Sequence, residues 1–356
     1  MAATTPPNVK VWARFGVAMS LAAPLACADE PRTENQASGT AAATSGPGIP
    51  AGSTSGSDAP GDSDDSAGSS SEESGAGPVL LDVGAPDGPG PKGGTGDGLG
   101  CEYIDVLFVV DISASMSEER ANLAANFPNF VSVLDAYVED NGALGYRVGV
   151  TNSSINDTYG GCETTMGLDG TMVAWGGGFL NMSDCGTGGI PWLDGPAPDM
   201  ATNFSCLAEN PIPQANTLSD CGAERPLGVM ERFIGEANGG ANEGFHRGEQ
   251  SLFVVVNLTD EDEDAMYTDT TPAATKAALD AFAGGEERYV AVTIAGPEAC
   301  ESAFGEAIHA QTLEAFTDLV PNGYFGNICD GDLADSLAQA LALIQSSCDA
   351  LPPPEG

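Results

Sequence analysis

An uninterrupted apolar run, Val106 to Val110, constrains the fold of this chain more than any other feature. Such a run is typical of a strand in a parallel sheet, because that strand is buried on both faces. The run ends at Asp111, and the sequence continues I-S-A-S before an amphipathic helical pattern begins after Ser115. The pattern therefore predicts a strand, a short polar loop and a helix, which together begin an α/β fold.

The loop between this strand and this helix carries a carboxylate and two hydroxyls, on Asp111, Ser113 and Ser115. In open α/β sheets, ligands bind beyond the carboxyl ends of the strands, where this loop is expected to lie. Hard oxygen donors of this kind suit Mg²⁺, Mn²⁺ or Ca²⁺. The structural alternative is that Ser115 and Glu118 form a capping box at the helix start, with Asp111 only a solvated residue.

A second apolar strand is predicted at 252–258, and it runs directly into the sequence T-D-E-D-E-D. Asp260 ends this strand much as Asp111 ends the first, so the two aspartates should converge if the strands are neighbours. The simpler interpretation of the next four residues, Glu261 to Asp264, is a solvated acidic loop. The alternative is an auxiliary Ca²⁺ site.

The D-x-S-x-S spacing of Asp111, Ser113 and Ser115, between a strand and a helix, resembles the metal-ion-dependent adhesion site of von Willebrand factor A-type domains. The resemblance covers roughly the last 250 residues, an ordinary domain size. It implies a divalent cation held by these three residues, with Asp260 acting often through water. One coordination position would stay open for a carboxylate on a protein partner.

The threonine that completes the site in that family has no clear counterpart in this chain. The expected loop reads C-G-A-E-R-P-L-G, so Glu224 could supply an oxygen instead, whereas Thr217 lies several residues too early. The predicted metal ligands are therefore Asp111, Ser113, Ser115, Asp260 and Glu224. We expect Mg²⁺, with Mn²⁺ or Ca²⁺ as alternatives, because Mg²⁺ tolerates a sparse site that keeps several waters.

The rest of the folded region alternates helical and strand patterns, which predicts a doubly wound, mostly parallel sheet with helices on both faces. Helices are expected at 117–140, 224–237, 271–282, 311–319 and 333–344, and further strands at 146–151, 288–295 and 324–328. Residues 152–223 interrupt the alternation with a Gly- and Cys-rich insertion. Within it, Gly170 to Trp175 could form an antiparallel edge strand.

The chain begins with a pattern typical of a bacterial export signal, over residues 1–27. Its apolar run is too short to span a bilayer, and it ends in P-L-A-C at Cys27, which resembles a lipobox. Cys27 is therefore predicted to be lipidated; ordinary cleavage near Ala26 is the alternative. Residues 28–99 lack the apolar side chains of a core, which predicts a disordered linker before a folded domain at 100–350.

Nine cysteines are present, and eight remain once Cys27 is set apart. An even number in an exported protein indicates disulfides. The expected pairs are Cys101–Cys348, Cys300–Cys329, Cys162–Cys185 and Cys206–Cys221. Topology suggests the first pair, because the last helix of a doubly wound sheet returns to the end where the first strand begins. The second pair brackets one helix.

The formal charge of −41 argues against binding to nucleic acid or to anionic membranes. Three functions remain: a metal-dependent protein-binding module, a domain with a structural role with or without metal, and a metal-dependent hydrolase. The hydrolase is the weakest, because the chain has no G-x-S-x-G or H-E-x-x-H motif. We expect a non-enzymatic, lipid-anchored adhesion protein of the bacterial outer membrane or cell surface that binds an acidic side chain on its partner.

Overall fold

The computed structural model describes most of the chain from residue 100 onward. The described ranges are 100–159, 162–176, 182–209, 211–213, 222–268, 270–302, 305–331 and 333–352. The predicted export signal with Cys27, the 28–99 linker, Thr217 and Cys221 lie outside them. The helices of the described part include none that is long and apolar enough to cross a membrane.

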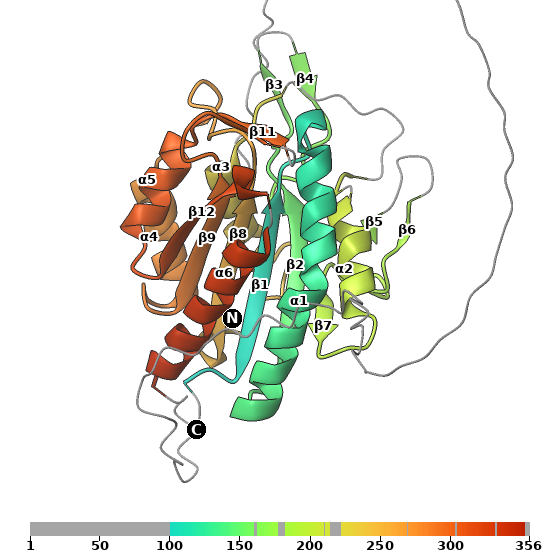
Figure 1. The fold of residues 1–356 in the computed structure, drawn as a ribbon, viewed down its shortest axis with the longest axis vertical. Helices are drawn as coiled ribbons and strands as arrows, with labels where there is room; N and C mark the ends of the chain where they lie inside the picture. Colours follow the sequence, from blue (N-terminus) through green and yellow to red (C-terminus); the bar gives the residue numbers. More distant parts are fainter. Residues whose placement is uncertain are drawn as a thin grey trace, which may run out of the picture. The chain divides into compact units, whose positions relative to one another are not determined.

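A six-stranded sheet forms the centre of the fold, in the order β12–β9–β8–β1–β2–β7 (Figure 1). Its strands are β1 (Tyr103–Val110), β2 (Gly145–Asn152), β7 (Leu193–Gly195), β8 (Ser251–Leu258), β9 (Tyr289–Ala295) and β12 (Gly323–Asn327). Neighbouring strands are parallel except for β2 and β7, which are antiparallel. The predicted doubly wound, mostly parallel sheet is confirmed.

Helices cover both faces of this sheet (Figure 1). They are α1 (Ser117–Asn141), α2 (Met200–Glu209), α3 (Pro226–Ala237), α4 (Pro272–Ala283), α5 (Gln311–Leu319) and α6 (Leu333–Ala350). Side chains alternate along β1, so Phe108 packs in the core beneath α1, α2 and α6, whereas Leu107 and Val109 pack in the core beneath α3, α4 and α5. This double burial explains the continuous apolar sequence of β1.

The register of β1 with its two neighbours aligns the carboxyl ends of β2, β1 and β8. Val110 pairs with Asn152 of β2 on one side and with Leu258 of β8 on the other. These residues are the last of their strands. The loops that follow the three strands therefore start side by side at the carboxyl edge of the sheet.

Short elements occupy the connections. They are η1 (Ala114–Met116), η2 (Gly248–Gln250), η3 (Ile328–Asp330) and the hairpin pairs β3 (Asp157–Tyr159) with β4 (Cys162–Thr164), β5 (Trp175–Gly176) with β6 (Ser183–Asp184), and β10 (Cys300–Ser302) with β11 (Gly305–Ala307). The antiparallel edge strand is β7, so the prediction at 170–175 is wrong. The backbone N–H groups of that segment bond instead to scattered acceptors, such as Val150 O and Asn242 Oδ1, and form no ladder with β2.

The structure contains the expected disulfides Cys101–Cys348 and Cys300–Cys329. It also joins Cys185 to Cys206, with their Cα atoms 5.6 Å apart, so the pairs Cys162–Cys185 and Cys206–Cys221 are wrong. The reason is that α2, which carries Cys206, packs beside β5. The disulfides seen among the described residues are typical of a protein that folds in an oxidising, extracytoplasmic environment.

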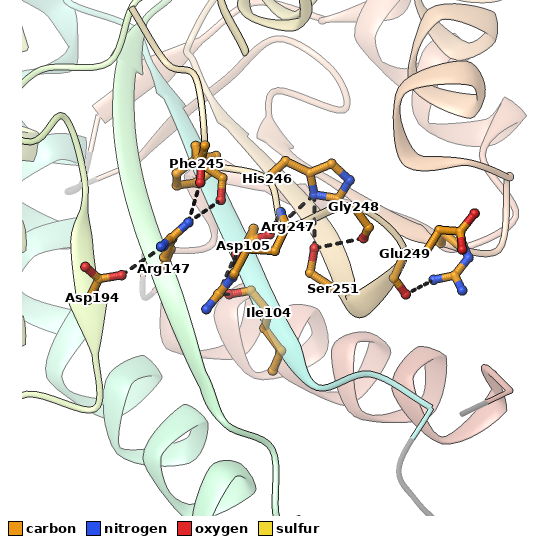
Figure 2. Close-up of polar contacts among 12 residues, drawn as sticks. Ile104, Asp105, Arg147, Asp194, Phe245, His246, Arg247, Gly248, Glu249 and Ser251 are labelled. Carbon is orange, nitrogen blue, oxygen red and sulfur yellow. Dashed lines mark hydrogen bonds and ion pairs between the residues drawn. The ribbon is translucent and has the colours of Figure 1, made fainter. Parts of the chain in front are cut away.

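A buried ion pair holds the N-terminal part of β1 in place (Figure 2). Asp105 is fully buried, and its carboxylate accepts hydrogen bonds from the Arg247 side chain at 2.5 and 2.9 Å and from the Arg247 backbone N–H at 2.9 Å. The guanidinium lies 4.0 Å from the centre of the Tyr103 ring. Burial alone raises the pKa of Asp105, but the hydrogen bond with His246 and the charge of Arg247 outweigh it and hold the pKa below its usual value.

We predict that Asp105→Ala lowers the free energy of unfolding by about 3–5 kcal/mol, because it leaves the Arg247 charge buried without its partner. Asp194→Ala is the matched control (Figure 2). Asp194 also pairs with an arginine, Arg147, but its side chain is 60% exposed, so its loss should cost less than about 1 kcal/mol. Urea unfolding of the disulfide-bonded proteins measures both. Equal losses in the two variants would contradict the assigned role of Asp105.

Candidate functional site

The loops after β1 and β8 meet at the carboxyl edge of the sheet. The backbone N–H of Asp111 donates to the Leu258 carbonyl at 3.0 Å, and the Thr259 hydroxyl donates to Asp111 Oδ2 at 2.8 Å. Asp260 follows Thr259 directly. Two of the predicted ligands, Asp111 and Asp260, are therefore brought to the same place by in-register pairing of their strands.

Ser113 and Ser115 lie on the same turn, with their hydroxyl oxygens 2.9 Å apart. The turn is closed by a hydrogen bond from the Ser113 backbone N–H to Asp111 Oδ1 at 2.7 Å. The helix that follows begins at Ser117 with Met116 as its N-cap residue, and no side chain caps it. The capping-box alternative for Ser115 is therefore wrong, and its hydroxyl points instead to that of Ser113.

Arg120, in the first turns of α1, holds this loop in place. Its Nη1 donates to the backbone carbonyls of Asp111 at 3.1 Å and of Ser113 at 3.0 Å. Burial lowers the pKa of the guanidinium, and four nearby carboxylates raise it. Those carboxylates belong to Asp111, Glu119, Asp260 and Glu224. Four acidic groups thus gather around one basic group.

Two of these carboxylates are buried with one oxygen unpaired. Asp260 is 4% exposed and Glu119 is 2% exposed, and neither Asp260 Oδ1 nor Glu119 Oε2 has a hydrogen-bond partner within the described part of the chain. Burial raises the pKa of Glu119 to about 7, and the charges of Asp260 and Glu118 add to the effect. Buried polar atoms without partners are costly, so these oxygens mark a place where a ligand would be stabilising.

Asp111 is in a similar electrostatic position. Its side chain is fully buried, and burial raises its pKa to about 7. Hydrogen bonds from Ser113 and Thr259 oppose this rise, and the negative charge of Asp260 adds to it. The cluster is therefore short of positive charge, and a cation beside it would favour the ionised forms.

Glu224 lies at the same edge of the sheet, beyond β2. Its Oε2 accepts a hydrogen bond from the hydroxyl of Ser153, which directly follows β2, and the next residue, Arg225, donates its backbone N–H to the Ser153 carbonyl at 2.9 Å. The negative charge of Glu224 raises the pKa of Arg120, as the charges of Asp111 and Asp260 do. Glu224 is thus near the cluster but engaged by Ser153, while the alternative Thr217 is outside the described residues.

The acidic residues after Asp260 do not form the solvated loop that we expected. Asp262 accepts backbone N–H bonds from Thr312 at 2.9 and 3.0 Å and from Leu313 at 3.1 Å, at the start of α5. Glu263 is 3% exposed and accepts the Leu227 N–H at 2.7 Å, at the start of α3. Both helices lack a side-chain cap of their own, so this loop caps two helices from a distance. These roles also leave Asp262 and Glu263 poor candidates for an auxiliary Ca²⁺ site.

The donor set fits a sparse cation site better than a carboxylate-rich one. Within the described ranges, no three His, Cys, Asp or Glu side chains are grouped as a metal centre would require. The hydroxyls of Ser113 and Ser115, however, are 2.9 Å apart, which matches the separation of about 2.9 Å between adjacent ligands of an octahedral Mg²⁺ at 2.0–2.1 Å. With the unpaired Asp260 oxygen, these hydroxyls and Asp111 are compatible with Mg²⁺.

One Ser–His–Asp grouping occurs at the opposite end of β1 (Figure 2). His246 Nδ1 lies 3.3 Å from Asp105 Oδ2 and 3.1 Å from the hydroxyl of Ser251. A hydrolytic triad needs the serine on one ring nitrogen and the carboxylate on the other. Here both use Nδ1, and Nε2 is buried with no partner in the part of the chain that the structure describes, so this grouping is not arranged for nucleophilic catalysis.

No protein-family model matches the sequence, and no curated protein matches it. Among solved structures, the fold is similar to proximal thread matrix protein 1 (PTMP1) from the mussel byssus in crystal form 2, with a TM-score of 0.39 and 12% identity over 69% of this chain and 49% of that one. Another structure of PTMP1 has a TM-score of 0.34 and 15% identity, over 70% of this chain and 47% of that one. The pilus adhesin SpaC from Lactobacillus rhamnosus GG, in its open conformation, has a TM-score of 0.32 and 12% identity over 68% and 30%. This chain spans about half or less of each of these proteins, and the likeness is distant.

The position of Glu263 gives a prediction about pH. Burial raises its pKa to about 7 from the ordinary value of 4.5 for a glutamate, although hydrogen bonds from Thr268, Leu227 and Gly228 oppose the rise. The folded protein therefore binds this proton more tightly than the unfolded chain does, and stability falls as pH rises from about 4.5 to about 7.

Glu263→Gln should make this fall shallower, by at most about 1.4 kcal/mol per pH unit. Its amide oxygen can still accept the Leu227 N–H. Urea unfolding between those pH values, with EDTA present, measures the slope for the wild type, Glu263→Gln and the exposed control Glu139→Gln. An unchanged slope in Glu263→Gln would contradict the assignment.

Proposed function

We propose that this chain is a divalent-metal-dependent protein-binding protein that acts in adhesion and has no catalytic activity. One observation carries the proposal. Asp111, the paired hydroxyls of Ser113 and Ser115, and an Asp260 oxygen that has no partner among the described residues converge where two adjacent in-register strands end. This is the set of residues that the resemblance to von Willebrand factor A-type domains implies.

Asp111, Ser113 and Ser115 would hold the cation, with Asp260 acting through water and Glu224 supplying an oxygen in place of the family's threonine. Mg²⁺ is the expected metal, and Mn²⁺ or Ca²⁺ are alternatives, since Mg²⁺ suits a site with few protein ligands. When bound, the metal would supply an open coordination position and a positive charge. Two of its ligands are uncharged hydroxyls, so the cation stays under-neutralised and favours one more carboxylate from outside.

The partner is therefore expected to be a protein that presents an acidic side chain. The formal charge of −41 disfavours nucleic acid and anionic lipid surfaces as partners. It also makes a divalent cation the natural bridge between this acidic chain and an acidic group on another protein. The protein would contact a membrane only through its lipid anchor.

A purely structural role is the second candidate, and Arg120 is the observation that favours it. Its guanidinium already provides one positive charge among the four carboxylates and bonds the carbonyls of the Asp111–Ser113 turn. In that case the cluster would need no metal. Metal binding in solution distinguishes the two candidates.

We also propose that the protein is exported and anchored at the bacterial outer membrane or cell surface through a lipid on Cys27. The disulfides support an oxidising location. The 28–99 segment would then act as a flexible tether. Chains of this length and composition have an r.m.s. span of about 45–50 Å, which would set the binding domain away from the lipid surface.

Titration calorimetry with Mg²⁺ and with Mn²⁺ tests the metal site. Asp111→Asn should reduce affinity by more than the roughly 10–100-fold that loss of an outer-shell partner costs, because it removes a charged ligand. Ser115→Ala changes an exposed side chain, so it should weaken binding without altering the fold. Asp318→Asn, on the exposed side of α5, is the control. Binding that is unchanged in Asp111→Asn would contradict the site, and a wild type that binds no metal would favour the structural role.

Radiolabelled palmitate, fed to cells that express the full chain, tests the anchor. The wild type should incorporate label and fractionate with membranes, because two or more acyl chains give stable anchoring. Cys27→Ala should be unlabelled and released into the soluble exported fraction. Equal labelling of the two proteins would show that Cys27 is not the acylated residue.

A further inference from the structure

An open hollow of about 530 Å³ lies directly beside the candidate metal site. Ser115 and Asp260 form one part of its lining, and the β10–β11 hairpin forms another. β11 contacts η1, the short helix between Ser113 and α1. Figure 1 shows β11 in its upper part, below the β3–β4 hairpin. Any group that reaches a metal at Ser115 would therefore have this hairpin as its neighbour.

The hairpin presents two like charges to the hollow. Glu301 of β10 is directly opposite Glu306 of β11 in the antiparallel register, both are exposed, and both line the hollow. Like charges at directly opposed positions destabilise a strand pair. A positive group placed between them would remove that cost.

Glu301 and Glu306 form an acidic wall of the hollow, and this wall is held at a fixed position relative to the candidate metal site. The Cys300–Cys329 disulfide ties β10 to the turn after β12, and the backbone N–H of Ile308, just beyond β11, donates to the Asp260 carbonyl at 2.9 Å. Asp260 also lines the hollow, is 4% exposed and has an oxygen without a partner among the described residues. The acidic wall therefore stands at a fixed place beside a buried carboxylate that a ligand in the hollow would stabilise.

The lining suits an organic cation better than a second metal ion. The glutamates are exposed, and no three acidic side chains of the described residues are grouped as a metal would require. Ile308 is 55% exposed, and Ala299 and Ala307 lie beside it in the lining. Lysine and arginine combine an aliphatic stem with a charged end, which matches an apolar surface next to paired carboxylates.

We infer that this hollow receives a lysine or arginine of the partner, next to the acidic residue that binds the metal. The inference rests on the proposed metal-dependent function and specifies its ligand: a segment with an acidic and a basic side chain close together. The stem of the basic residue lies along Ile308 and its charge lies between Glu301 and Glu306. An acidic segment without a neighbouring basic residue binds more weakly.

A random peptide library displayed on phage, panned against the full chain in Mg²⁺ and in EDTA, tests this inference. Mg²⁺ should select peptides with Asp or Glu and, at a preferred spacing, Lys or Arg. A selected peptide is then synthesised with its basic residue intact or replaced by norleucine, and the Kd of each is measured.

The double variant Glu301→Gln/Glu306→Gln should weaken binding of the intact peptide by roughly two- to thirtyfold, the effect of losing two exposed charge contacts. It should leave the norleucine peptide nearly unaffected. Glu139→Gln/Asp140→Asn removes two charges about 30 Å further along α1 than Glu119 and should change neither Kd. An intact Cys300–Cys329 disulfide and an unchanged circular dichroism spectrum show that the variants are folded.

The outcomes separate this inference from the proposed function. Mg²⁺-dependent selection of acidic residues with no preference for Lys or Arg would overturn the inference and leave the metal-dependent function in place. Selection of basic residues in EDTA, lost in Glu301→Gln/Glu306→Gln, would support the hollow and overturn the metal dependence. No selection in either condition would overturn both.

Discussion

The pairing of β1 with both of its neighbours is the constraint on which the rest of the structure depends. Because Val110 is level with Asn152 and with Leu258, the side chains that follow the three strands share one small volume. A slip of one residue would turn Asp111 to the other face of the sheet and separate it from Thr259. Six residues before Asp111, near the start of β1, the buried pair of Asp105 with Arg247 joins β1 to the segment that leads into β8. The register is thus held at both ends of the strand.

Burial of acidic groups is handled in different ways at different places in the fold. Asp105 is paired with an arginine, and Glu263 accepts a backbone N–H at a helix start, as Asp262 does near the surface. Glu119, Asp260 and Glu263 each keep a buried oxygen without a partner among the described residues. Two of these three acids, Glu119 and Asp260, act on the same arginine, Arg120, at the candidate site, so a cation beside the paired hydroxyls would stabilise both.

Local sequence pattern predicted what depends on local structure. The apolar runs gave β1 and β8 nearly to the residue, and Asp111 and Asp260 were identified because they end those strands. The helix-capping roles of Asp262 and Glu263 could not be seen, because their helices start about 50 residues later and 36 residues earlier. The Cys185–Cys206 bond and the three-residue strand β7 depend on how the insertion packs, which no periodic pattern reports. Glu119 was overlooked, although it lies one helical turn beyond Ser115, because its burial comes from a distant hairpin.

That hairpin connects the candidate metal site to the wall of the hollow. Gly305 has a φ of +134°, and a Cβ on it would lie only 1.4 Å from Glu119 Oε1, so the backbone of the hairpin can approach the carboxylate only where there is no side chain. The same hairpin carries Glu301 and Glu306 on the hollow, and its continuation bonds the Asp260 backbone through Ile308. A displacement of the hairpin would therefore move the acidic wall, expose Glu119 and disturb Asp260 together. Recognition of a basic group in the hollow and retention of a cation at the strand ends are consequently properties of one connected piece of backbone.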